Sequence, residues 1–332
     1  MYSEDDLNTA IEQKIFTQNA VDEFRQAISN IKNSPSVDEE NFRLVNGFND
    51  IFVVIAICLL LFSSIYVLKP VNDSLASFSF VALSWILSEF FVLKRKMSLP
   101  AIVLLIAFVG GIFSATLSFF KGTSEPAMVT AAALATVGAY THWLRFKVPI
   151  TVAAGTVALI GTLVSVILSV FPDAKEWILA LVAICGIGSF FLAMYWDSAD
   201  LTRTTRKADV AFWLHLISAP LIIHPLFSML GVLEGDQSII NMAGVIVLYI
   251  IMSLISIAID RRAFMVSSLA YVLYALTTIL KNYGDVDYSF AVTGVFMGAL
   301  LLLLSAFWQV TRRRVVSWLP VGLTKYVPNV VN

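Results

Sequence analysis

The stretch ILALVAICGIGSFFLAMY, residues 178–195, contains no charged side chain in eighteen positions. A helix needs about 20 apolar residues to cross the hydrocarbon core of a bilayer. The apolar residues are continuous and do not alternate with polar ones, which argues against a strand of a membrane β-barrel. This stretch is therefore predicted to be a transmembrane helix.

Nine further stretches of the same kind predict a bundle of ten spans. None contains Lys or Arg, and the 332-residue chain is 58% hydrophobic and 14% charged, with a mean hydropathy of +0.83. A soluble domain has about 25% charged residues, so a soluble globular protein is excluded. The predicted spans are 51–68, 75–93, 100–120, 126–143, 148–171, 178–195, 210–230, 239–259, 264–280 and 289–310.

The basic residues of the connections alternate between the two sides of this predicted bundle. Fifteen lie on one side and four on the other. Because positively charged loops stay in the cytoplasm, both termini are predicted to be cytoplasmic and the membrane to be the inner (plasma) membrane. A missed or additional helix would break the alternation.

Charge divides the chain into three predicted parts within an all-α, polytopic transmembrane bundle. Residues 1–50 hold ten acidic and four basic side chains, whereas the remainder is net basic. The basic body fits the headgroups of a lipid bilayer, and the acidic arm argues against nucleic acid as a partner. We expect a cytoplasmic acidic amphipathic arm at 1–49, a ten-helix transmembrane domain at 50–311 and a cytoplasmic basic tail at 312–332.

The arm is expected to contain one short amphipathic helix. Apolar residues recur at helical spacing from Leu7 to Ile31, and Asn33-Ser34-Pro35 ends the pattern. A helix with one apolar stripe cannot bury that stripe alone. Docking on the chain's own basic inner loops, self-association, and a protein partner bound through residues 4–32 are the open alternatives.

The predicted span 210–230 is interrupted by Pro220 and Pro225. Each proline removes an amide donor and frees the carbonyl four residues earlier, on Leu216 and Leu221. We therefore expect this helix to be kinked or unwound between Leu216 and Pro225. Interrupted helices are common in transporter sites, although prolines also kink membrane helices that have no such site.

Two histidines on this span can exchange protons near neutral pH. They are nine residues apart, which places their rings on opposite faces of an ideal helix and argues against a shared metal. The alternative is a neutral histidine satisfied between helices, and the third histidine, His142, is expected at the interface. The candidate substrate or proton site comprises His215, Pro220, His224, Pro225, Asn241, Tyr271 and Tyr274.

The connection 196–209 is the most charged on the inner side. Asp197, Asp200, Arg203 and Arg206 are spaced three residues apart, so opposite charges can pair along one helical face. Asp209, the last acidic residue of the connection, suits the start of a helix. Glu89 lies about 7 Å from the inner edge, within reach of a basic loop. A self-paired interfacial helix and a cytoplasmic gate are the alternatives. The gate candidates are Glu89, Asp197, Asp200, Arg203, Arg206 and Asp209.

Motifs that carry soluble enzyme chemistry are absent from the sequence. It contains no phosphate-binding glycine loop, no His-Glu-x-x-His pair, no Gly-x-Ser-x-Gly turn and no clustered Cys or His. No catalytic residue, metal or cofactor is therefore expected. An intramembrane enzyme is the least favoured interpretation.

The lead-in Asn46-Gly47-Phe48-Asn49-Asp50-Ile51-Phe52, the short arm and the basic inner turns resemble those of uncharacterised bacterial inner-membrane proteins of about ten helices. This resemblance implies the architecture and no activity.

Two functional hypotheses follow. One is a small-solute or proton-coupled transporter in which span 210–230 is the functional helix, and the other is a non-transporting scaffold or assembly factor that binds a partner through the arm.

The topology makes a direct prediction. Reporter fusions after Lys207 and after Asp236 should report opposite sides of the membrane, because one span and the charge alternation separate them. Enzymatic reporters that are active on only one side provide the measurement. The same compartment at both positions would contradict the ten-span topology.

Overall fold

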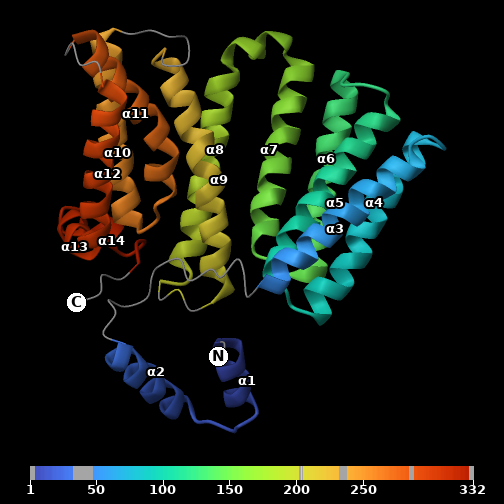
Figure 1. Cartoon of the computed structure of the whole chain (residues 1–332), viewed down its shortest axis with the longest axis horizontal. Helices are drawn as coiled ribbons and strands as arrows, with labels where there is room; N and C mark the ends of the chain where they lie inside the picture. Colours follow the sequence, from blue (N-terminus) through green and yellow to red (C-terminus); the bar gives the residue numbers. More distant parts are fainter. Residues whose placement is uncertain are drawn as a thin grey trace. The chain divides into compact units, whose positions relative to one another are not determined.

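The structure is a computed structural model that describes residues 4–32, 48–201, 203, 205–231, 238–283 and 288–328. Every regular element in these residues is helical (Figure 1). The helices fall into two units, of which the first contains α1 and α2 and the second contains α3 to α14. The second unit is the polytopic helix bundle that the sequence predicts.

The first unit contains two helices where one was expected, α1 (Glu4–Glu12) and α2 (Gln18–Lys32). The chain reverses at Lys14, whose φ of 57° lies in the left-handed region. Thr17 then caps α2, because its hydroxyl accepts a hydrogen bond from the amide of Ala20 at 3.2 Å. The helical spacing of apolar residues thus continues through the turn between α1 and α2, and for this reason it does not predict the turn.

The second unit follows the predicted spans in order, and its two last helices are short. The 3-10 turn η2 (Pro172–Trp177) precedes α8, and the π-helical turn η1 (Glu89–Lys94) extends α4. The α-helices are α3 (Phe48–Leu68), α4 (Asp73–Ser88), α5 (Ser98–Phe119), α6 (Glu125–Phe146), α7 (Ile150–Val170), α8 (Ile178–Ser198), α9 (Arg206–Met229), α10 (Ile239–Ile259), α11 (Ala263–Tyr283), α12 (Ser289–Ala306), α13 (Trp308–Ser317) and α14 (Val321–Thr324).

Within the described residues, nine helical segments are long and apolar enough to cross a membrane. The tenth long helix, α6, is less apolar, and small residues form most of its buried face. It packs along both α5 and α7, and small residues allow membrane helices to approach closely. That α6 is a tenth span stays a prediction. Its buried residues are Ala127, Ala131, Ala132, Ala135, Gly138, Ala139, His142 and Phe146.

Helix α9 is the most enclosed span of the bundle. In its most apolar window 56% of the residues are buried, compared with 44% in α10, the next most buried of the nine. It contacts α7, α8 and α11, and its contact with α8 is the most extensive between any two helices (Figure 1). The span that the sequence singles out therefore lies at the centre of the packing.

Of the two expected distortions of this span, unwinding is wrong, and a kink stays a prediction. Helix α9 is continuous from Arg206 to Met229 through both prolines. Helix α8 lies close to it beside the carbonyl that Pro225 frees, since a Cβ on Gly186 would lie 2.8 Å from the carbonyl carbon of Leu221. A neighbouring helix that covers a proline site lets the helix continue in a membrane.

The last span ends earlier than predicted, at Ala306 rather than Val310. The backbone turns at Phe307, and α13 begins at Trp308. Helix α13 packs against α10, and Figure 1 shows α13 and α14 at the same end of the bundle as the α8–α9 connection. The described part of the basic tail is therefore folded against the bundle.

The close approach of α8 to α9 predicts different outcomes for two neighbouring glycines. Gly186→Ala should lower stability by about 1–3 kcal/mol, because the added methyl group overlaps the backbone of α9. A Cβ on Gly188 meets nothing within 4 Å, so Gly188→Ala should be neutral or slightly stabilising. Thermal unfolding in detergent measures both, and equal shifts would contradict the close contact.

Candidate functional site

Charged side chains gather at the end of the bundle where α8 ends and α9 begins. Five of the six are buried, and the side chain of Arg203 is 10% exposed. Ionisable groups at such positions are costly and mark functional sites by default. Three carboxylates balance three guanidinium groups. We call this set the buried charge cluster: Asp197, Asp200, Arg203, Asp260, Arg261 and Arg312.

Asp197 is the centre of the first half of the cluster. Arg261 donates from Nη2 to its Oδ1 at 2.7 Å and from Nε to its Oδ2 at 3.3 Å. The ring Nε2 of His215 lies 3.1 Å from Oδ2, and Arg261 also donates to the carbonyl of Ala208 at 3.1 Å. These bonds join α8, α9 and the α10–α11 connection.

Asp260 is the centre of the second half. It ends α10 with a φ of 61°, a left-handed conformation that Asp tolerates better than most residues. Its Oδ2 accepts from Arg203 Nη1 at 3.2 Å, and its Oδ1 accepts from Trp308 Nε1 at 2.8 Å and lies 3.5 Å from Arg312 Nε. The α8–α9 connection and α13 are thereby fixed to the end of α10.

The described tail adds one more bond to this half. Arg312 Nη2 donates to the carbonyl of Pro328 at 2.6 Å. Arg203 Nη2 likewise donates to the carbonyls of Ile259 and Asp260, both at 3.1 Å. The guanidinium groups therefore bind backbone as well as carboxylates, as buried cations require.

His215 is fully buried beside the cluster. Its ring contacts Phe190 and Phe264, with centroid distances of 5.6 and 6.4 Å. A carboxylate only accepts hydrogen bonds, so Nε2 carries the proton that binds Asp197, and in the neutral ring Nδ1 is a free acceptor. Within the described residues Nδ1 has no hydrogen-bond partner. Nδ1 is therefore an unpaired nitrogen in a buried ring.

The structure separates the two histidines of α9. His215 joins the cluster, whereas His224 is exposed and its Nδ1 lies 2.8 Å from the hydroxyl of Tyr271. Tyr274 is 39% exposed. Asn241 lies in the first turn of α10, where its backbone N–H donates to the hydroxyl of Ser238 at 3.3 Å. The predicted group thus divides into His215 and a separate contact between α9 and α11.

Within the described residues the 196–209 connection is not one continuous helix, so the alternative of an interfacial helix is wrong. Helix α8 extends to Ser198 and buries Asp197, and the chain reverses at Arg203, whose φ is 54°. From the α10–α11 connection, Arg261 binds Asp197 and Asp260 binds Arg203. Asp200 instead accepts from the amide and hydroxyl of Thr205, at 2.8 and 2.7 Å, and Arg206 and Asp209 lie in the first turn of α9.

Glu89 pairs with a basic residue, but with Arg145 of α6 and not with the nearby loop at 94–96. Arg145 binds it with two hydrogen bonds of 2.8 Å, in a pair that remains partly exposed. His142 is buried, with its Nδ1 3.3 Å from the hydroxyl of Thr151 and its ring 4.5 Å from that of Phe146. Neither group belongs to the charge cluster.

Sequence analysis missed Asp260, Arg261, Trp308 and Arg312. The count of basic residues in the connections treated Arg261 and Arg312 as solvated bases on the inner side. The available signal was Asp260 itself, an acid placed directly between an apolar span and two arginines. In the described part of the chain, no group of three or more His, Cys, Asp or Glu side chains is arranged to hold a metal ion.

The cluster predicts that its ion pair matters more for stability than an exposed pair does. Arg261→Met should destabilise the protein by about 3–5 kcal/mol, because Asp197 is left charged and buried. Arg145→Met is the matched control at the exposed pair with Glu89 and should have a smaller effect. Thermal unfolding in one detergent compares the two. Similar losses in both variants would mean that the Asp197 pair is not buried as described.

No family model, curated protein or solved structure in the three comparisons matches this chain. The functional argument therefore starts from the geometry of the bundle. That geometry describes a multi-pass membrane protein with several long apolar helices. One end of its helix bundle contains the charge cluster and a buried histidine.

Proposed function

We propose that this protein is a proton-coupled transporter of a small solute in the inner (plasma) membrane, with both termini in the cytoplasm. In this proposal the charge cluster and His215 form the cytoplasmic gate. The observation that carries it is the buried imidazole of His215, which binds Asp197 and has a free acceptor nitrogen. Buried ionisable relays of this kind are common in pumps and transporters.

The charge balance of the cluster couples protonation to opening. Three carboxylates and three guanidinium groups compensate one another while His215 is neutral. Arg261 and Arg203 are the cations that act electrostatically on the ring, and Asp197 is the anion. A proton on Nδ1 adds an uncompensated positive charge to a buried site, which favours a state in which water enters or an arginine moves away.

The bonds of the cluster lie where a gate would have to open. Arg261 links the α10–α11 connection to α8, and Arg203 links the α8–α9 connection to the end of α10. Loss of these two contacts would free both connections while the helices stay intact. The contact between His224 of α9 and Tyr271 of α11, with Tyr274 also on α11 and Asn241 on α10, is the proposed polar surface for the solute.

A scaffold or assembly factor is the second candidate, supported by the arm. Three of its large apolar residues, Ile15, Phe16 and Phe24, are 64%, 49% and 47% exposed. Ile15 and Phe16 lie in the turn between α1 and α2, and Phe24 lies on α2. Exposed apolar residues of this kind favour a partner or a second copy of the chain. This candidate requires no flux.

The transport proposal is tested with purified protein in proteoliposomes that contain a pH-sensitive dye. A pH gradient is applied with a broad solute panel, and internal pH and solute uptake are recorded. His215→Gln should abolish solute-coupled proton flux, because the glutamine amide can still donate to Asp197 but cannot be protonated. His142→Gln, the matched change at the buried histidine of α6, which belongs neither to the cluster nor to the proposed solute surface, should have a smaller effect.

The outcomes separate the two candidates. Equal losses in both variants would remove His215 from the coupling, provided that thermal unfolding shows both to be folded. No flux of any solute by the unaltered protein would favour the scaffold. In that case deletion of residues 4–32 should release the bound partner and leave the bundle inserted.

A further inference from the structure

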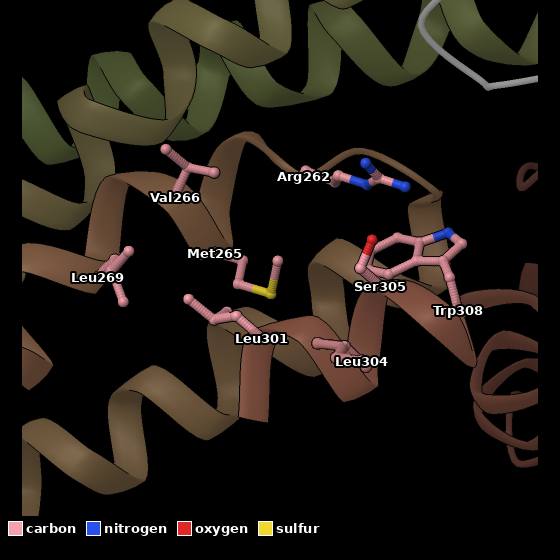
Figure 2. A pocket seen from close by; sticks show the side chains of 8 residues that line it. All are labelled: Arg262, Met265, Val266, Leu269, Leu301, Leu304, Ser305 and Trp308. Carbon is pink, nitrogen blue, oxygen red and sulfur yellow. The ribbon is translucent and has the colours of Figure 1, made fainter. Parts of the chain in front are cut away.

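We propose that the groove between α11 and α12 binds an anionic phospholipid, with the lipid phosphate on Arg262 and one acyl chain along the groove. The groove has a volume of about 200 Å³. Figure 2 shows the side chains that line it, four from the α11 side and four from the α12–α13 side. This inference is independent of the proposed transport activity.

The lining is apolar except near one end. Met265 and Leu269 of α11 face Leu301 and Leu304 of α12 across the groove (Figure 2). From Arg262 to Leu269 the helix rises about 10 Å, at 1.5 Å per residue. The groove therefore runs from a cation at the end of the span into the depth of the hydrocarbon layer, as an acyl chain does below its headgroup.

Arg262 is the feature that selects the ligand charge. Its neighbour Arg261 is buried and bound to Asp197, whereas Arg262 is half-buried, and in the described part of the chain it forms no ion pair. Its guanidinium group lies 5.0 Å from the centroid of the Trp308 ring. The indole thus holds the cation in place and leaves its hydrogen-bond donors free for a phosphate.

The surroundings favour a lipid as the occupant. The flanking residues Val266, Leu302 and Leu303 are 62%, 74% and 58% exposed, so hydrocarbon must cover this face of the bundle. Arg313 and Arg314, exposed on α13, add positive charge near Trp308. Cations at the cytoplasmic end of spans attract anionic headgroups.

Native mass spectrometry of the full chain in detergent tests the proposal. Phosphatidylglycerol and phosphatidylcholine with identical acyl chains are added at equal concentration. Arg262→Gln should weaken phosphatidylglycerol binding by about tenfold, the loss of a charge-assisted contact, and should remove most of its advantage over phosphatidylcholine. Arg262→Lys should keep part of that advantage because the charge remains.

Two further variants separate the groove from general lipid adsorption. Ser305→Phe, which fills the groove from an exposed position, should weaken the binding of both lipids. Arg95→Gln is the matched control, because Arg95 also lies over an aromatic ring, 5.8 Å from the centroid of Phe90, but is not part of the groove. It should leave binding unchanged.

The results that would overturn the proposal are equally specific. An unchanged preference for phosphatidylglycerol in Arg262→Gln, measured with protein that thermal unfolding shows to be folded, would remove the arginine from the site. Equal effects of Arg95→Gln and Arg262→Gln would indicate adsorption without a site. Displacement of the lipid by an equal concentration of inorganic phosphate would make a soluble anion the ligand.

Discussion

The arrangement of one end of this bundle depends on the need to pair a carboxylate that is buried among apolar helices. An isolated charge in a low-dielectric interior is too costly to keep. Asp197 is fully buried, and it is accommodated because Arg261 and His215 both bind it. These partners come from different parts of the chain, so neutralising this single charge fixes α8, α9 and the α10–α11 connection in one position.

The same requirement explains the form of the C-terminal segment. Asp260 ends α10 in a left-handed turn and accepts hydrogen bonds from Arg203 and Trp308. For Trp308 to reach Asp260, α12 must end and the chain must turn before it, which it does at Phe307. The tail is therefore ordered by a polar contact, and its basic composition does not by itself leave it in solvent.

Much of the fold could be predicted from the sequence, because hydropathy and the alternation of basic loops are local properties. The candidate site could be predicted only in part. Asp197, Arg203 and His215 were identified as candidates, but a pattern of charges at steps of three describes neighbours on one helix. The actual partner of Asp197 is 64 residues away, and only the packing of separate spans brings Arg261 to it.

The adjacent arginines at 261 and 262 show how one turn can serve two environments. Arg261 points into the bundle and neutralises Asp197, while Arg262 lies beside the groove over Trp308. The same indole donates its N–H to Asp260, so its polar edge belongs to the charge cluster and its face belongs to the groove. A rigid ring with both functions fixes the distance between the buried charges and the lipid-facing surface. Any movement of α13 that opens the cluster must therefore also displace the platform on which Arg262 rests.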